Sequence, residues 1–191
     1  YMGDCIMAFW NAPIDDPDHA KNGVRSALAM FDESDKMNEV LKIEAEQEGR
    51  KYIPLRIGAG LNTGICCVGN MGSDMRFDYS VLGDDVNLAA RLEGQSKTYG
   101  VNIVLGQSTY EAVQEFACLE LDRIQVKGKT VPVDIFCVLG DEARAQSEKF
   151  KIVKALGAQM ISAYRSQEWK IASAKIIELQ EADENKELEV L

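Results

Sequence analysis

A chain of 191 residues is long enough to bury one good hydrophobic core with a small appendage. Its hydrophobic content of 46% and charged content of 27% are those of an ordinary soluble globular protein, and its formal net charge of −10 argues against nucleic-acid binding as the main role. Such a charge still permits a small anion held by a few local cations. We find no run long enough to span a membrane and no signal-peptide pattern, and therefore expect no membrane contact by this segment.

Cysteine and histidine usage narrows the possible chemistry. The five cysteines are odd in number and mostly lie inside apolar, strand-like runs, which predicts reduced core residues, and the adjacent pair Cys66-Cys67 lacks the spacing of metal ligands. The single histidine, His19, follows Asp18 at an expected helix start, where a surface or capping residue is the simplest interpretation. These features argue against histidine-based nucleophilic catalysis and a histidine-rich metal site.

The first residues predict a tight turn. Gly3 and Asp4 stand between Tyr1-Met2 and an apolar run over residues 5–10, so we expect a hairpin whose first strand begins before the chain does. Asp4 would lie at the tip of this hairpin. From these residues alone, a simple turn-former is the better interpretation of the aspartate.

Scaffold elements come next. An apolar stripe over residues 18–48 predicts a long helix, and residues 53–68 predict one long strand. Residues 69–73 then predict the turn of an antiparallel hairpin. Glycines inside a strand often mark bulges or close backbone approach, and the long strand contains Gly58, Gly60 and Gly64. Their spacing fits neither a Rossmann fingerprint nor a P-loop.

The stretch around which the rest is organised is residues 77–93, F-D-Y-S-V-L-G-D-D-V-N-L-A-A-R-L-E. It predicts a short strand, a turn at residues 83–84 and a helix from about Asp85. Asn87 and Arg91 are four apart and share one helical face, while the positions around them are apolar. A guanidinium fork suits phosphate oxygens and an amide is short and directional, so the face favours an anionic ligand. Taken alone the pattern is weak, because most such pairs are a solvated edge or a local hydrogen-bonded pair.

The following residues predict a strand over 101–106, a short helix over 108–115, and two strands over 119–126 and 131–138. The turn K-G-K-T joins the last two strands. Its lysines, Lys127 among them, are by default solubilising residues of an exposed hairpin tip. Only their context would make one of them a phosphate ligand.

Beyond Gly140 the composition shifts to charged helix. Residues 141–191 predict a helical hairpin that resembles one unit of a tetratricopeptide-type repeat, and we therefore divide the chain into a domain of residues 1–140 and this hairpin. A single unit buries its own apolar face poorly. It must pack on the main domain, on a partner, or on further repeats.

Four segments in order carry a family resemblance: Y-M-G-D-C-I-M-A-F-W, G-A-G-L-N-T-G, R-F-D-Y-S-V-L-G-D-D-V-N-L-A-A-R-L-E and V-K-G-K-T-V-P-V. Together, over about residues 1–140, they resemble the class III adenylate/guanylate cyclase catalytic domain, and most closely the bacterial adenylate cyclases. The resemblance implies an α+β fold, a ferredoxin-like antiparallel sheet with helices on one face, here N-terminally truncated, followed by the helical hairpin.

The resemblance also implies a function. The family converts a nucleoside triphosphate, here ATP, to a 3′,5′-cyclic monophosphate and pyrophosphate with two Mg²⁺ or Mn²⁺ ions, in a homodimer with shared active sites. Asp4 matches the second metal carboxylate, and Ser80 falls where the family reads the purine edge. Asn87 matches the residue that positions the ribose, Arg91 the cation at the α-phosphate, and Lys127 the ligand of the terminal phosphates, all three from the other subunit. The domain is expected in the cytoplasm, alone or as part of a membrane-anchored sensor.

Departures from the family pattern leave alternatives open. The first metal carboxylate and the base-reading lysine or glutamate both fall before the start of the chain, so we expect this chain alone to be poorly active or inactive. Ser80 stands where many adenylate cyclases carry Asp or Thr and guanylate cyclases often carry Cys, and a hydroxyl that both donates and accepts does not settle the base. The alternatives are a guanylate cyclase, a degenerate cyclase domain acting as a regulatory or dimerisation module, and a protein-binding role for the helical hairpin.

Overall fold

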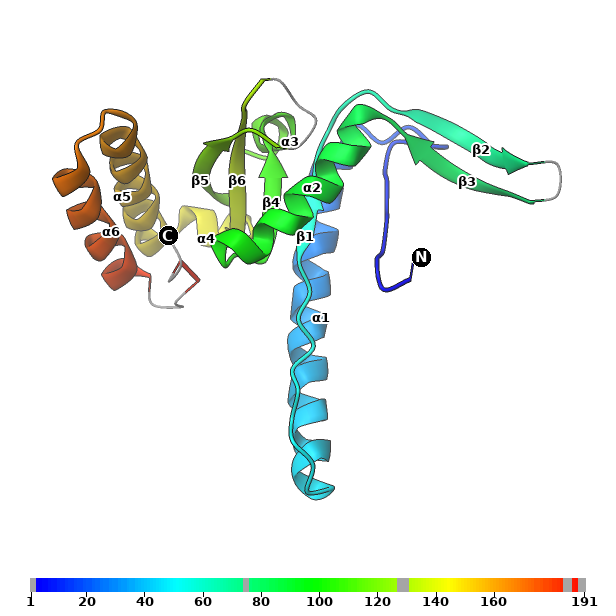
Figure 1. The fold of residues 1–191 in the computed structure, drawn as a ribbon, viewed down its shortest axis with the longest axis horizontal. Coiled ribbons are helices and arrows are strands. Elements are labelled where there is room, and N and C mark those ends of the chain that lie inside the picture. Colours follow the sequence, from blue (N-terminus) through cyan, green and yellow to red (C-terminus); the bar gives the residue numbers. More distant parts are fainter. Residues whose placement is uncertain (1–2, 74–75, 127–130, 184–186, 189–191) are drawn as a thin grey trace.

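The computed structural model describes residues 3–73, 76–126, 131–183 and 187–188. Within them the chain forms a four-stranded sheet of order β1-β4-β6-β5 and a separate two-stranded sheet of β2 and β3 (Figure 1). The α+β class expected from the sequence is confirmed. The elements in chain order are α1 (His19–Gln47), β1 (Ala59–Leu61), β2 (Cys67–Ser73), β3 (Arg76–Leu82), α2 (Asp84–Tyr99), β4 (Ile103–Gly106), α3 (Gln107–Ala112), β5 (Ala117–Ile124), β6 (Val133–Gly140), α4 (Glu142–Gln146), α5 (Glu148–Arg165) and α6 (Trp169–Ala182).

The four-stranded sheet is mixed rather than purely antiparallel. β4 pairs parallel with β1 and antiparallel with β6, which in turn pairs antiparallel with β5. Every residue of β4 is buried. A strand buried on both faces needs cover on both sides of the sheet.

Helices supply that cover on both faces, which corrects the expectation of helices on one face. Alternate residues of β4 point to opposite sides, as the pleat requires. Ile103 and Leu105 pack with Val24 of α1 and with α3. Val104 packs with Leu88 of α2, and α5 lies on the same side. The sheet is therefore the middle of three layers.

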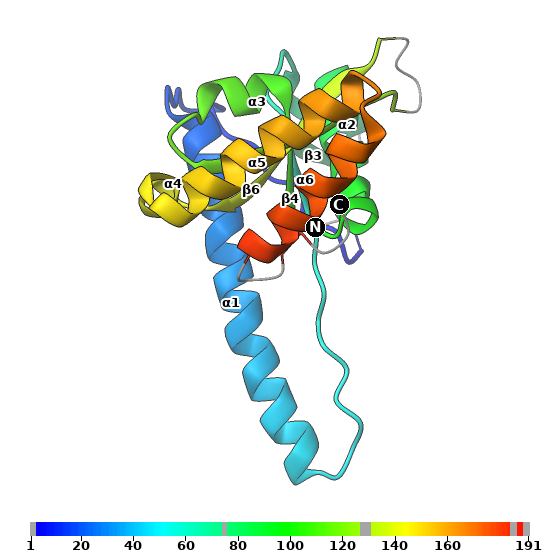
Figure 2. The same ribbon diagram turned by 90° about the vertical axis from the view of Figure 1, so that its left-hand side faces the viewer.

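α1 reaches well past the sheet that its first turns cover (Figures 1 and 2). It spans His19–Gln47, close to the expected helix. The chain then returns along α1, where the Asn38 side-chain amide donates to the Leu55 carbonyl at 2.9 Å and its oxygen accepts from the Leu55 amide at 2.7 Å. Within the described part of the chain, α1 and this returning segment form an arm rather than part of a sheet.

The prediction of a single long strand over residues 53–68 is wrong. Only β1 pairs with β4, from Ala59↔Ile103 to Leu61↔Leu105, because β4 ends at Gly106 where α3 begins. The chain then leaves the sheet and re-enters pairing at Cys67, in β2.

The hairpin of β2 and β3 is confirmed, with its turn in a different place. Residues 69–73 belong to β2, and the last pair of the hairpin is Ser73↔Arg76. The N-terminal run over residues 5–10 does not form the expected strand, since only Cys5 makes a bridge. This run instead packs across β3, with the Phe9 and Tyr79 ring centroids 5.9 Å apart.

The C-terminal helical hairpin is confirmed, and it packs on the main sheet. Gly157 of α5 lies against Leu119 of β5, where a Cβ atom would collide with the leucine side chain. Leu179 of α6 is fully buried in the same core cluster as the sheet residues. The sequence left open whether the hairpin packs on the main domain, on a partner or on further repeats, and the structure shows it on the main domain. The division of the chain at residue 140 stays a prediction.

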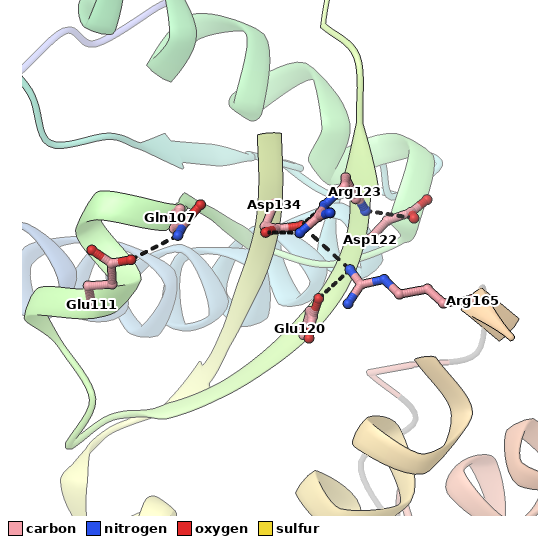
Figure 3. A network of polar contacts seen from close by, with 7 residues as sticks. All are labelled: Gln107, Glu111, Glu120, Asp122, Arg123, Asp134 and Arg165. Atoms are coloured by element: carbon pink, nitrogen blue, oxygen red, sulfur yellow. Dashed lines mark hydrogen bonds and ion pairs between the residues drawn. The ribbon is translucent and has the colours of Figure 1, made fainter. Parts of the chain in front are cut away.

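An ion-pair network fixes the end of α5 to β5 and β6 (Figure 3). Arg123 donates to Asp134 through Nε at 2.6 Å and Nη2 at 2.8 Å, directly across the strand pair. Arg165 of α5 donates to Glu120 at 2.5 Å and approaches Asp134 at 3.5 Å. The Arg123 guanidinium lowers the pKa of the Asp134 carboxyl.

No helix among the described residues combines the length and apolarity needed to cross a bilayer.

α2 packs so closely on β1 that only glycine fits between them. A Cβ atom at Gly60 would collide with the carbonyl oxygen of Ala89 and the backbone of Glu93. At Gly69 in β2, by contrast, a Cβ atom would meet nothing within 4 Å. The sequence prediction of close backbone approach at a strand glycine is therefore confirmed at Gly60.

This contrast gives a first prediction. Gly60→Ala should lower the free energy of unfolding by about 1–3 kcal/mol, because backbone cannot yield as a side chain can. Gly69→Ala is the matched control and should be neutral or slightly stabilising, through reduced freedom of the unfolded chain. Urea unfolding measures both, and equal midpoints for the two variants would contradict the packing described here.

Candidate active site

The site is built on α2, and the local sequence explains why this helix begins and ends where it does. Gly83 precedes it, and Asp84 and Asp85 occupy its first turn, where carboxylates interact favourably with the helix dipole. Gly100 ends it in a left-handed conformation with φ of 66°. The strand-turn-helix expected from the sequence is confirmed.

Asn87 and Arg91 lie on one face of α2, as their spacing predicts. Asn87 is exposed, and its backbone amide donates to the Gly83 carbonyl at 3.3 Å in the first turn. Arg91 follows one turn later and is half-buried. Leu88 and Leu92, each one residue further along and so about 100° around the helix, are buried in the core. The helix thus presents an amide and a cation from a rigid, well-packed support.

Arg91 lacks the partners that other arginines of the chain have. Its Nη1 is buried and makes no hydrogen bond, and across the described residues it is the one buried side-chain nitrogen or oxygen in that state. A buried donor without a partner is unfavourable by about 1–3 kcal/mol, so native proteins rarely keep one without a reason. Arg123 and Arg144, in contrast, each bind a carboxylate with two nitrogens. Among the described residues, none supplies an acceptor to this nitrogen of Arg91.

Ser80 lies on β3, opposite Gly69 of β2, and is half-buried. β3 runs through Gly83 directly into α2. Ser80 and the Asn87–Arg91 face are therefore carried by one continuous strand-turn-helix unit.

Asp4 stands apart from that face. It is exposed in a turn that Gly3 makes possible with φ of 63°. Within the described residues no hydrogen bond or ion pair joins Asp4 to Asn87 or Arg91, and the N-terminal segment runs on the hairpin side of the molecule (Figure 1). The structure brings Asn87 and Arg91 together and leaves Asp4 elsewhere. Lys127 lies outside the described residues.

The described residues do not by themselves form a metal centre. In the parts of the chain that the structure describes, no group of three or more His, Cys, Asp or Glu side chains is placed to hold an ion. Asp4 alone offers one carboxylate. A metal site at this position would need ligands beyond those described.

Sequence reasoning missed a contact that holds the start of α2. The Asn62 side-chain amide donates to the Asp85 carbonyl at 3.2 Å and to Asp85 Oδ1 at 3.1 Å. Gly64 leaves room for the same carboxylate, because a Cβ atom there would collide with it. The signal was present in the segment G-L-N-T-G, which carried part of the family resemblance but no assigned role.

The cysteines only partly follow the expectation of buried core residues. Cys118 and Cys137 are buried in the sheet, and burial raises the pKa of the Cys118 thiol to about 12 and raises that of Cys137 as well. Cys5, Cys66 and Cys67 are exposed, because their segments leave the four-stranded sheet. All five are free thiols.

Comparison with known proteins agrees with this geometry. Residues 1–163 match the family described as the adenylate and guanylate cyclase catalytic domain. Since the match covers most of the chain, the chain belongs to this family. Adenylate cyclase 1 of Rhizobium meliloti is 31% identical over 141 residues, which are 73% of this chain and 20% of that protein. An adenylate cyclase of Anabaena cylindrica is 31% identical over 141 residues, covering 71% of this chain and 26% of the relative. The chain thus spans about a fifth to a quarter of the length of these relatives.

Solved structures of both cyclase types are similar. The adenylyl cyclase CyaB from P. aeruginosa has a TM-score of 0.57 and 32% identity, over 70% of this chain and 65% of that one. The guanylyl cyclase Cya2 has the same TM-score and identity, over 68% of this chain and 62% of that one. The nucleotide cyclase fold is therefore shown, and these two similarities do not distinguish the base.

A second prediction compares Arg91, whose Nη1 has no partner among the described residues, with Arg144, which binds a carboxylate. Arg91→Met should leave the free energy of unfolding unchanged or raise it, because it removes a buried donor that has no partner. Arg144→Met should lower it by about 1–3 kcal/mol, since it strands the Glu187 carboxylate and the Leu139 carbonyl that Arg144 binds. Thermal or urea unfolding measures both. A clear loss of stability in Arg91→Met would show that Arg91 supports the fold.

Proposed function

We propose that the chain is the catalytic domain of an adenylate cyclase, which converts ATP to 3′,5′-cyclic AMP and pyrophosphate. The observation that carries the proposal is the buried Nη1 of Arg91, which has no hydrogen-bond partner among the described residues, on a helix that Leu88 and Leu92 anchor in the core. In a chain of net charge −10, this cation needs an anionic partner. The triphosphate of a nucleotide supplies one, and family membership gives the reaction.

The reaction is an in-line attack of the ribose 3′-hydroxyl on the α-phosphate, with pyrophosphate leaving. Arg91 places a fixed fork of donors where negative charge develops on the α-phosphate oxygens. Asn87, one turn earlier on the same face, offers an amide to the ribose and so orients the attacking hydroxyl. Lys127 would bind the terminal phosphates and Ser80 the purine edge.

Divalent metal ions, Mg²⁺ or Mn²⁺, belong to this proposal through the family. Bound ions of this kind lower the pKa of a hydroxyl nucleophile and neutralise phosphate charge. Asp4 would contribute one carboxylate, and its exposure on a turn suits a ligand for an ion shared with substrate. The other ligands lie beyond the described residues.

The separation of Asp4 from α2 supports a site shared between two copies. If Asp4 and Arg91 act on one nucleotide, and no described contact brings them together within one chain, a homodimer can supply them from different subunits. We place Asp4 on one subunit and Asn87, Arg91 and Lys127 on the other. Such a domain would act in the cytoplasm, in cyclic nucleotide signalling.

Guanylate cyclase activity is the second candidate. Cya2, named a guanylyl cyclase, is as similar to this chain as CyaB by TM-score and identity. Ser80 can donate or accept a hydrogen bond and favours neither purine. Adenylate is preferred because the curated relatives from Rhizobium meliloti and Anabaena cylindrica are named adenylate cyclases.

A third prediction tests the activity. When ATP and GTP are supplied with Mn²⁺, we expect cyclic AMP rather than cyclic GMP from a version extended upstream by the natural sequence, and little or no product from this chain assayed beside it. Arg91→Ala should lower kcat/KM by at least about 100-fold, as loss of a preorganised electrostatic contact does. Lys97→Ala removes an exposed cation from the last turn of the same helix and is the matched control.

The outcomes divide cleanly. Cyclic GMP as the main product would replace adenylate by guanylate. No product from either form, with either nucleotide, would favour a degenerate cyclase domain. Equal activity of Arg91→Ala and the unaltered protein would remove Arg91 from the site.

A fourth prediction tests the shared site. Asp4→Ala and Arg91→Ala proteins should each be nearly inactive, while an equal mixture should regain about a quarter of the unaltered activity, because half of the dimers formed at random contain one intact site of two. The control mixes either single variant with the double variant, where no intact site can form. Absence of recovery after verified subunit exchange would place both residues in one chain's site.

A further inference from the structure

The start of α2 lacks the side-chain cap that commonly fixes a helix N-terminus. Gly83 is the residue before the first turn and has no side chain to accept a hydrogen bond from the helix amides. Two other helices, α4 and α5, do have such caps, from Asp141 and Ser147. The first turn of the helix that carries Asn87 and Arg91 therefore depends on contacts from outside the helix.

Asn62 provides that outside contact. Its Nδ2 donates to the Asp85 carbonyl at 3.2 Å and to Asp85 Oδ1 at 3.1 Å, so one amide holds both the backbone and the side chain of a first-turn residue. Asp85 precedes Asn87 by two positions and Arg91 by six, which is about 9 Å along the helix axis. A shift of the first turn would move both site residues.

Asn62 is itself firmly placed. It follows Leu61, the last residue of β1 paired with β4, and its Oδ1 lies against Gly106 so closely that a Cβ atom there would collide with it. The next residue, Thr63, bonds in another direction and does not hold Asn62: its hydroxyl shares a hydrogen bond of 2.9 Å with Thr109 of α3. The amide is thus carried by the sheet and not by a free loop.

We propose that Asn62 is a positioning residue for catalysis, which acts through Asp85 to hold the Asn87–Arg91 face of α2 in register with the sheet. The inference rests on the proposed cyclase function for its kinetic consequence. Asn62 does not touch the reacting atoms in this arrangement. Its effect reaches them through the first two turns of α2.

The kinetic test compares Asn62→Ala with Thr63→Val in the extended protein. Asn62→Ala should lower kcat by about 10- to 100-fold with KM nearly unchanged, because misplacement of a transition-state contact by a fraction of an ångström to 1 Å has effects of this size. Thr63→Val removes a neighbouring hydrogen bond that does not reach α2, and should keep the unaltered kcat. Equal losses in both variants would reduce Asn62 to a general structural role.

A second comparison isolates the path through Arg91. In an Arg91→Ala background, Asn62→Ala should lower kcat further by less than about threefold, because residues that act as a unit are not additive. A merely structural role predicts the same fractional loss in both backgrounds. That result would overturn the inference.

A reciprocal exchange tests the contact with Asp85. Asn62→Asp should lower kcat more than Asn62→Ala does, because it sets two carboxylates about 3 Å apart. Adding Asp85→Asn restores a donor and an acceptor, so the double variant should recover part of the lost kcat. A double variant no better than Asn62→Asp would show that this pair does not position the helix.

Amide hydrogen exchange keeps this inference separate from the proposed function. If the unaltered protein makes no cyclic nucleotide, the cyclase proposal fails. The Asn62–Asp85 contact, here called the clamp, is then tested by the exchange rate of the Asn87 backbone amide, which donates to the Gly83 carbonyl. Asn62→Ala should speed its exchange by about 10-fold through local opening, and Thr63→Val should not. Unchanged exchange in Asn62→Ala would overturn the clamp whether or not the protein is active.

Discussion

The contact on which the rest of the structure depends is the packing of α2 directly on β1, with no side chain at Gly60 to hold them apart. Because the helix lies this close, Leu88 and Leu92 reach the core of the sheet, while Asn87 beside them is exposed and Arg91 is half-buried. The apolar face fixes where the polar face points. A helix placed by backbone contact has little freedom to shift, which would suit the proposed reaction, since that reaction depends on positioning phosphate charge.

Charge pairing elsewhere in the chain makes Arg91 informative. Arg123 and Arg165 meet Asp134 and Glu120 at the edge of the sheet (Figure 3), so the fold readily supplies carboxylates where a guanidinium has only a structural task. At Arg91 it supplies none among the described residues. Under the proposed function, the anion that pairs with Arg91 in this chain of net charge −10 is the phosphate of the nucleotide.

The elements with strong local signals could be predicted from the sequence, and those set by distant partners could not. The helix of Asn87 and Arg91 follows from its apolar spacing, and the close approach at Gly60 from a glycine inside a strand. The early end of β1 could not be foreseen, because it depends on the short length of β4, whose paired residues lie 44 positions further along the chain. For the same reason, the sequence did not predict that helices cover both faces of the sheet; the expectation was of helices on one face. The role of Asn62 requires the Asp85 contact, which pairs residues that local periodicity does not relate.

The incomplete set of site residues on one chain has a physical consequence. A chain that carried the metal carboxylate and the phosphate cation side by side would let them neutralise each other, since an aspartate within about 4–6 Å of an arginine forms an ion pair. Keeping Asp4 on an exposed N-terminal turn and Arg91 on a packed helix prevents that pairing within a subunit. Under the proposed function, both charges would then remain available to a nucleotide and its metal ions. Assembly of two chains would be a condition for catalysis, and any input that changes how the chains meet would control the rate without altering either set of residues.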